Sequence, residues 1–362
     1  MSEFVHVAVD AMGGDNAPAE IVKGVVNALN GCPNLKVTLT GKEDLVRAEL
    51  SGQQYPADRL EILNCTEVVE MGEHPVNAIR TKKDSSMVRG LRLVREGVCD
   101  AFVTAGNSGA VLAGGQLIVL KLKGIERAPL APILPTAKGP VLLIDCGANM
   151  DARPSWLVQF AQMGSIYMRN MTGIENPRVG LINVGTEDDK GSALTLEVNK
   201  LLKECPGINY VGNIETRDLP EGVVDVAVTD AFTGNAVLKM YEGVAKVILH
   251  ELKEVLLSTV AGKIGALLIK PSLRGMLKKF DASEYGGAPL LGLRGLVVKA
   301  HGNSKAAEIQ HALEQCITFK EKKINDILYT EMKLEEAAAN RVKNRDKNKD
   351  NADRNNGTEK GE

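Results

Sequence analysis

Short apolar runs rich in β-branched residues alternate along this chain with longer segments in which apolar residues recur at helical spacing. This alternation predicts parallel strands joined by helices, because two parallel strands need a crossover connection. The expected strands are residues 5–9, 37–40, 60–63, 101–104, 141–144, 179–183, 210–212, 224–229 and 296–299. The expected helices are residues 17–29, 85–95, 108–120, 155–171, 192–202 and 235–255. The predicted fold class is therefore α/β, a largely parallel sheet with helices on both faces.

Two segments depart from this pattern. Residues 255–280 are apolar but are interrupted by glycines, by Pro271 and by several lysines and arginines. We expect a helical hairpin lobe over residues 240–285, broken at Pro271 because proline removes a helical hydrogen bond. Residues 333–362 are polar and charged, which predicts a disordered tail. The predicted organisation is one large α/β domain over residues 1–332, including the hairpin lobe, followed by this tail.

Glycine and small polar residues follow five of the predicted strands at the points where the strands end. The segments are DAMGGDNAP from residue 10, AGNSG from residue 105, DCGAN from residue 145, NVGTE from residue 183 and TDAFTGN from residue 229. Ligands bind at the carboxyl edge of an open parallel sheet, so we expect the five segments to converge there. Glycine lets backbone N–H groups approach a ligand, and helix N-termini add unpaired donors. This edge therefore suits phosphate or another oxyanion.

Several residues at this edge have a second interpretation that the sequence leaves open. Asp10, Asp145 and Asp230 could simply cap turns or helices, which is the commoner role for aspartate at such positions. Cys146 could be a nucleophile, although a small buried thiol is the commoner case. His301 could bond a ligand or transfer a proton, or it could bond the backbone where a helix begins.

Composition and motifs exclude several classes of function. Aromatic residues make up 4% of the chain and the formal net charge is −2, which argues against nucleic-acid binding. The dinucleotide and P-loop motifs are absent, and the histidines and cysteines lack the spacing of a zinc site, so we expect no cofactor and no metal. Six scattered cysteines and an N-terminus unlike a secretory signal predict a cytoplasmic protein with reduced thiols.

Seven motifs occur in the order in which one enzyme family has them. They are VAVDAMGGDNAP, TAGNSGA, DCGAN, NVGTEDDKG, TDAFTGN, YGGAPLLGLRG and KAHGNS. Through these motifs the chain resembles the bacterial phosphate acyltransferases of phospholipid synthesis, the PlsX type, from about residue 5 to about residue 327. One departure is Ala231, at a position where the family pattern has glycine.

The resemblance implies transfer of a fatty acyl group from acyl-[acyl carrier protein] to inorganic phosphate, giving acyl phosphate. It also implies a homodimer whose fold is like that of isocitrate/isopropylmalate dehydrogenases and phosphotransacetylases. The acyl phosphate would pass to a membrane glycerol-3-phosphate acyltransferase. The segment 255–280 then suits either a peripheral membrane contact or the dimer interface. The alternatives are a phosphotransacetylase-like enzyme that uses acyl-CoA, a dehydrogenase, and a non-catalytic module that senses phosphate or lipid.

Attack of phosphate on a thioester requires an enzyme to hold phosphate beside the carbonyl and to stabilise the oxyanion that forms. We expect the segment 107–109 to hold phosphate, and Lys190 or His301 to assist the leaving thiolate. The residues expected to be catalytic are Asp10, Asn149, Asn183, Lys190 and His301. The residues expected to bind substrate are Gly13, Gly14, Asn16, Gly106, Asn107, Ser108, Gly109, Asp230 and Asn235.

An acidic carrier protein requires a basic docking surface. The densest group of cations in the sequence is Arg80, Lys82, Lys83, Arg89 and Arg92. The three-residue spacing of Arg89 and Arg92 places them on one face of a helix. A solvated helix face is the alternative interpretation of this group.

Overall fold

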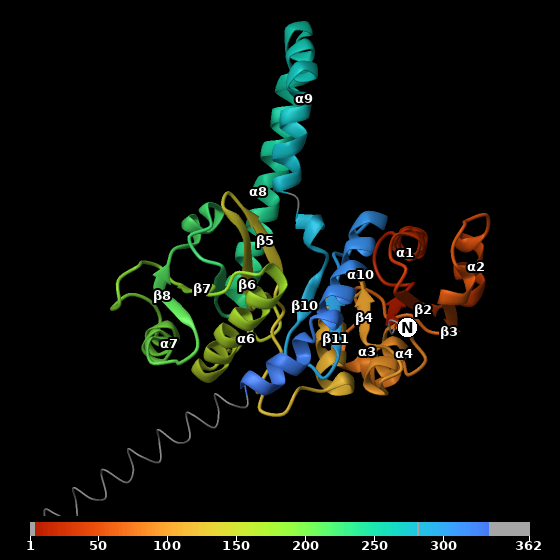
Figure 1. The fold of residues 1–362 in the computed structure, drawn as a ribbon, viewed down its shortest axis with the longest axis horizontal. Coiled ribbons are helices and arrows are strands. Elements are labelled where there is room, and N and C mark those ends of the chain that lie inside the picture. The colour runs from red at the N-terminus through yellow and green to blue at the C-terminus, as the bar shows by residue number, and fades with distance from the viewer. Residues whose placement is uncertain (1–3, 281, 333–362) are drawn as a thin grey trace, which may run out of the picture.

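The computed structural model describes residues 4–280 and 282–332. Two lobes, each built around one sheet, lie side by side, and a long helical hairpin projects beyond both (Figure 1). The prediction of a mostly parallel α/β fold is confirmed, and the strands divide between two sheets rather than forming one. The tail expected over residues 333–362 lies outside the described residues.

The six-stranded sheet has the order β10-β11-β4-β1-β2-β3. Its strands are β1 (Val5–Asp10), β2 (Leu35–Gly41), β3 (Leu60–Asn64), β4 (Ala101–Thr104), β10 (Ala288–Leu290) and β11 (Leu296–Lys299). All of these strands pair in parallel except β10 with β11. Val7 and Val9 pack with α1 (Ala19–Gly31) and α10 (Ala306–Glu321), whereas Ala8 packs with α4 (Ser86–Arg95). Both faces of the sheet are therefore buried, which explains the continuous apolar runs.

The five-stranded sheet has the order β5-β6-β9-β7-β8. Its strands are β5 (Ile133–Thr136), β6 (Gly139–Ile144), β7 (Arg178–Ile182), β8 (Asn209–Ile214) and β9 (Val226–Val228). Only β5 pairs antiparallel among these strands. Leu142 packs with α6 (Pro154–Thr172), and Leu143 packs with side chains of α8 (Ala231–Leu257). Helices thus cover this sheet on both faces as well.

The expected strands and helices are present to within a few residues. The strands that the pattern missed are β5 and β10, and each contains a proline, Pro135 or Pro289. Both strands lie at a sheet edge, where proline is tolerated because one side of the strand makes no ladder hydrogen bonds. The remaining elements are α2 (Glu43–Leu50), α3 (Pro75–Thr81), α5 (Ser108–Gly114) with a π-helical continuation (Gly115–Val119), α7 (Ala193–Lys203), α9 (Val260–Lys279) and the 3₁₀ turns Ala57–Arg59, Thr216–Glu221 and Ala282–Tyr285.

The hairpin consists of α8 and α9, and its turn lies at Ser258 and Thr259. The prediction of a break at Pro271 is wrong, because α9 continues through this proline. The chain turns where side chains can satisfy the backbone at helix ends. Ser258 Oγ donates to the carbonyl of Val255 (2.8 Å), and Thr259 Oγ1 accepts from the N–H of Gly262 (2.9 Å).

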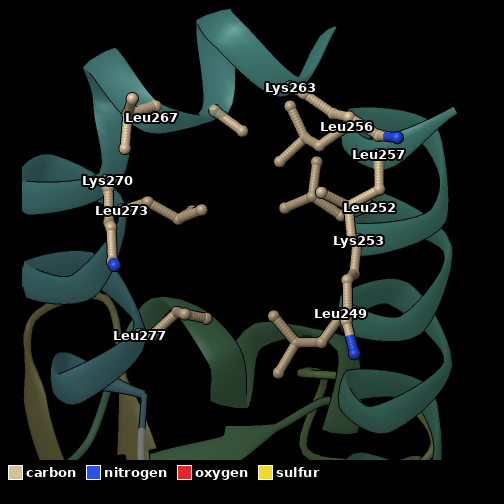
Figure 2. Close-up of a pocket in the computed structure, with 11 residues that line it drawn as sticks. Leu249, Leu252, Lys253, Leu256, Leu257, Lys263, Leu267, Lys270, Leu273 and Leu277 are labelled. Carbon is tan, nitrogen blue, oxygen red and sulfur yellow. The ribbon is translucent and has the colours of Figure 1, made fainter. Parts of the chain in front are cut away.

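An apolar pocket of about 450 Å³ lies between α8 and α9 (Figure 2). Its lining is mainly leucine, namely Leu249, Leu252, Leu256, Leu257, Leu267, Leu273 and Leu277. Val247, Val260 and Leu268 are also exposed, to 61%, 76% and 76%. The hairpin therefore presents apolar surface that the rest of the described chain leaves uncovered. No helix in residues 4–280 and 282–332 is both long and apolar enough to cross a bilayer.

Candidate active site at the strand ends

Asp10 joins the ends of β1 and β4. Its Oδ2 accepts a hydrogen bond from Thr104 Oγ1 (2.8 Å), and its Oδ1 accepts one from the N–H of Met12 (3.1 Å). Thr104 Oγ1 in turn accepts from the N–H of Gly106 (2.9 Å). Burial raises the pKa of the Asp10 carboxyl group above its ordinary value. In this structure Asp10 thus holds the loop after β1 against the loop after β4.

The loop after β1 also packs directly against the loop after β11. A Cβ atom at Gly13 would lie 2.6 Å from Asp10 Oδ2, and one at Gly14, whose φ is +103°, would lie 2.9 Å from the carbonyl oxygen of Gly302. Glycine is therefore required at both positions by close approach, and at Gly14 by conformation as well. Asn16 Nδ2 donates to the carbonyls of residues 303 and 304 (2.9 and 3.2 Å), which ties the two loops together.

Asn107 caps α5 and holds a neighbouring loop. Its Oδ1 accepts from the N–H of Ala110 (3.0 Å), and its Nδ2 donates to the carbonyls of residues 70, 71 and 73 (3.2, 2.9 and 3.1 Å). The Asn107 side chain, which was predicted to hold phosphate, therefore makes its hydrogen bonds to other groups of the protein. The donors left at this helix end are backbone N–H groups, those of Ser108 and Gly109, because the first N–H groups of a helix have no partner inside it.

Lys299 is a residue of this edge that the sequence analysis missed. It is the last residue of β11 and is only 8% exposed. Its ammonium donates to the carbonyl of Ala105 (3.3 Å), in the loop after β4, and to that of Ala300. No carboxylate in the described part of the chain forms an ion pair with it, and burial lowers its pKa to about 8. The sequence does contain a signal for this residue, because a lysine ends the otherwise apolar strand LVVK.

The loop after β6 is organised by Asp145, which is fully buried. Its carboxylate accepts from the N–H groups of Leu130 (2.9 Å), Ala148 (3.2 Å) and Asn149 (2.9 Å) and from Asn149 Nδ2 (2.7 Å). Burial nevertheless raises its pKa to about 6. The side-chain amide of Asn149, a residue predicted to be catalytic, therefore donates a hydrogen bond to Asp145 in this structure. Cys146 is buried and its thiol pKa is raised by that burial, which agrees with the buried-thiol interpretation.

The loop after β9 leads into α8. Asp230 caps this helix, since its carboxylate accepts from the N–H of Thr233 (3.0 Å) and from Thr233 Oγ1 (2.7 Å). The capping interpretation thus describes the contacts of Asp230, whereas Asp10 and Asp145 also accept hydrogen bonds from Thr104 and Leu130 of other segments. Ala231 is the first residue of α8, where a helical backbone makes no demand for glycine. The side chain of Asn235 lies beside Gly147, so the loops after β6 and β9 meet.

Asn183 organises the loop after β7. Its Nδ2 donates to the carbonyl of Lys190 (2.9 Å), and its Oδ1 accepts from the N–H of Val184 (2.9 Å). Lys190 lines a polar pocket of about 330 Å³ together with Glu187 and Arg217. This pocket lies at the β7–β8 side of the five-stranded sheet, whereas His301 follows β11 of the other sheet.

His301 connects the loop after β11 to α8 of the other lobe. Its Nε2 lies 3.2 Å from both carboxylate oxygens of Glu242, a residue of α8 that the sequence analysis did not select. The hydrogen bond to Glu242 raises the pKa of His301. A second connection is Ala148 of the β6 loop, which packs against the apolar cluster that contains Ala110 and Val111 of α5. The strand ends expected to form one edge are therefore divided between two sheets, and these contacts join the loop after β11 to α8 and the loop after β6 to an apolar cluster of the other lobe.

The predicted docking residues lie on α3, α4 and the turn between these helices. Lys82 pairs with Glu73, and Arg89 pairs with Asp84 (3.3 Å). Two of the five cations therefore already have an acidic partner, and docking at this helix stays a prediction.

The chain matches the model of a family described as "Fatty acid synthesis protein" over residues 5–326. It is 48% identical over 323 residues to a phosphate acyltransferase of Clostridium botulinum, covering 89% of this chain and 97% of the relative. It is 48% identical over 315 residues to a phosphate acyltransferase of Clostridium tetani, covering 87% and 94%. The chain belongs to this family. The predictions of the family and of an enzyme of the transferase class are therefore confirmed.

Solved structures share the fold at low sequence identity. A phosphotransacetylase from Streptococcus pyogenes aligns with a TM-score of 0.56 at 17% identity, over 88% of this chain and 95% of that one. A branched-chain phosphotransacylase from Enterococcus faecalis V583 aligns with a TM-score of 0.53 at 13% identity, over 87% and 98%. These similarities confirm the predicted phosphotransacetylase-like architecture.

Replacing Glu242 with glutamine should lower the pKa of His301, because the carboxylate that stabilises its protonated ring is removed. NMR titration of the His301 ring measures this shift. In the wild type, the pair stabilises the fold fully below the unfolded pKa of about 6.5, and this contribution is lost as the pH rises through the raised pKa. Glu251→Gln makes the same charge change elsewhere on α8 and should leave the titration unaltered. An unchanged titration in Glu242→Gln would contradict the pairing.

Proposed function

We propose that this enzyme transfers a fatty acyl group from acyl carrier protein to inorganic phosphate, giving acyl phosphate for phospholipid synthesis. The names of its relatives support phosphate as the acceptor, and the family description supports a fatty acyl donor. In this proposal the enzyme is cytoplasmic, needs no cofactor, and hands its product to a membrane glycerol-3-phosphate acyltransferase.

The buried ammonium of Lys299 is the observation that carries the proposal. The hydrogen-bond partners of this cation are two backbone carbonyls, and the carboxylates of Asp10 and Asp15 act on it only from beyond ion-pair distance, so its positive charge is not fully neutralised. It lies at the loop after β4, next to the N-terminus of α5, so an anion bound there meets both an ammonium group and backbone N–H donors. Phosphate has the charge and the oxygen acceptors that this combination selects.

The reaction needs little more than positioning and charge stabilisation. A phosphate oxygen attacks the thioester carbonyl carbon, the new C–O bond forms, and the carbonyl electrons move onto its oxygen. The carbonyl then re-forms, the C–S bond breaks, and its electron pair leaves with sulfur. In the proposal His301, kept protonated to higher pH by Glu242, gives the thiolate its proton. Backbone N–H groups of the strand-end loops stabilise the transient oxyanion.

The hairpin has two roles in this proposal. Its leucine-lined pocket faces the corresponding surface of a second copy, which gives a homodimer. Its exposed apolar residues, interspersed with lysines, make a transient contact with the membrane that receives the product.

The reaction is tested by incubating the protein with palmitoyl carrier protein and phosphate and trapping acyl phosphate with hydroxylamine. Lys299→Met should raise the phosphate KM by about tenfold or more with little change in the thioester KM, since a hydrogen bond to a charged group contributes roughly 1.5–3 kcal/mol. In the wild type the phosphate KM should rise as the pH passes about 8, where Lys299 loses its proton.

Lys36→Met is the matched control, because Lys36 lies in the same sheet but pairs with Glu61 (2.6 Å) away from the strand ends. Lys299→Arg, which keeps the charge, should recover part of the phosphate affinity. Equal phosphate KM values in Lys299→Met and the wild type would contradict the role of the ammonium. Faster turnover with palmitoyl-CoA than with palmitoyl carrier protein would favour the phosphotransacetylase-like alternative.

Leu268→Glu should weaken binding to vesicles that contain anionic lipid, because it places a charge on an exposed apolar position of the hairpin. Sedimentation with vesicles measures the bound fraction, and sedimentation velocity without lipid reports whether the dimer persists. Val211→Glu changes an exposed valine of β8 in the same way and serves as the control. Equal vesicle binding of Leu268→Glu and wild type would dismiss the membrane contact.

A further inference from the structure

Five cations gather around the single tryptophan of the chain, outside the strand-end site. Contacts place four of them, Lys121, Arg127, Arg153 and Arg294, and the fifth, Lys123, is two residues from Lys121 in the chain. The tryptophan is Trp156. The Cζ atoms of Arg127 and Arg153 lie 4.8 and 5.6 Å from the centroid of the Trp156 ring. Stacking on an aromatic ring holds a guanidinium in place while its N–H groups stay available to an anion. We call these six residues the Trp156 surface.

Backbone contacts tie the other cations to the stacked pair. Arg294 Nε donates to the carbonyl of Lys121 (3.3 Å), and Lys121 Nζ donates to the carbonyl of Glu126. The pKa of Lys121 is lowered, first by burial and then by the positive charge of Arg127. Lys121 and Arg127 are therefore close enough to repel each other, and the carboxylate of Glu126 offsets part of this repulsion.

These cations lack acidic partners in the described part of the chain. None of the five forms an ion pair within residues 4–280 and 282–332. Two carboxylates lie nearby, Glu126, which accepts from Trp156 Nε1 (2.8 Å), and Asp151, two residues before Arg153. The surface thus has an excess of positive charge on a chain whose formal net charge is −2. Such an excess attracts an acidic partner.

Exposed apolar side chains border the cations. Leu117, 50% exposed, follows Gln116, whose Oε1 accepts from Arg127 (3.1 Å). Met150, 56% exposed, follows Asn149 of the loop after β6. Tryptophan, arginine and methionine are enriched in protein–protein interfaces, where apolar contacts accompany charged ones.

The Trp156 surface adjoins the strand-end site. Asn149 Nδ2 donates both to Asp145 (2.7 Å) and to the carbonyl of Ala128 (3.2 Å), the residue after Arg127. A partner docked on the surface would therefore lie beside the loop after β6, from which a flexible thioester arm has a short path to the strand ends.

We propose that the Trp156 surface docks the acidic acyl carrier protein, an inference that rests on the proposed function. Its arginines are held at fixed positions by Trp156, which suits the fixed carboxylates of a folded protein better than a fluid lipid surface. Lys82, in the turn after α3, and Arg89, on α4, were predicted from the sequence to dock the carrier protein, and each pairs with a carboxylate instead of stacking on an aromatic ring.

The double charge reversal Arg127→Glu/Arg153→Glu tests the docking surface. The KM for palmitoyl carrier protein should rise by about tenfold or more at low salt with kcat nearly unchanged, because two favourable charges become unfavourable. The KM for palmitoyl-pantetheine, a donor without the carrier protein, should stay within about twofold. The difference between the variant and the wild type should shrink from about 50 to about 200 mM NaCl, as screening increases.

Arg89→Glu/Arg92→Glu is the matched control, with the same charge change on α4. If this control raises the carrier-protein KM and the Trp156 variant does not, docking occurs on α4 and the proposal is overturned. An equal rise of the KM for palmitoyl carrier protein and for palmitoyl-pantetheine in the Trp156 variant would overturn the proposal as well. Loss of vesicle binding with an unchanged carrier-protein KM would assign the surface to lipid instead.

Binding is measured independently of turnover by Trp156 fluorescence, titrated with a carrier protein that lacks tryptophan. The affinity should fall by about tenfold or more in the double variant, and Arg127→Gln/Arg153→Gln gives the same comparison if charge reversal prevents folding. If the wild type binds the carrier protein but forms no acyl phosphate, the proposed reaction fails while docking stands. Unchanged binding in either double variant overturns the docking surface.

Discussion

The absence of side chains at Gly13 and Gly14 lets the loop after β1 pack directly against the loops after β4 and β11. Because these loops meet through their backbones, the Asp10 carboxylate is enclosed between two strand ends and bonded to Thr104. The same close packing places the carbonyl of Ala105 over the Lys299 ammonium. A larger residue at either glycine would separate the loops, and the buried charges would lose their partners.

Asp145 and Lys299 are buried charged residues at the strand ends, and they differ in the partners that the protein gives to their charges. Asp145 accepts four hydrogen bonds from its own and neighbouring loops, so its charge is used to shape the loop after β6. Lys299 has two carbonyl partners and no ion pair among the described residues. The charge of Asp145 thus has four hydrogen-bond donors, whereas the Lys299 ammonium meets the carboxylates of Asp10 and Asp15 only from beyond ion-pair distance. Under the proposed function, Asp145 therefore shapes the loop after β6, and Lys299 binds the anion.

Two surfaces outside the strand ends match partners of different chemistry. The hairpin presents leucine and valine beyond the body of the molecule, and the proposed function assigns this surface to a second copy and to lipid. The Trp156 surface presents two arginines stacked on an aromatic ring, and we propose an acidic protein as its partner. Both are connected to the site, the first through Glu242 of α8 and the second through Asn149.

The sequence by itself determined most of the strands and helices, the glycine-rich strand ends and the family, because each of these depends on patterns among neighbouring residues. It did not reveal β5 and β10, whose prolines are tolerated only because tertiary structure places them at sheet edges. Nor did it locate the hairpin turn, which forms at Ser258 although α9 contains Pro271. Only the tertiary structure decided the division into two sheets and the partners of His301 and Lys299. Those contacts join residues 59 and 194 positions apart, and no local pattern records which distant backbone or carboxylate a buried charge will meet.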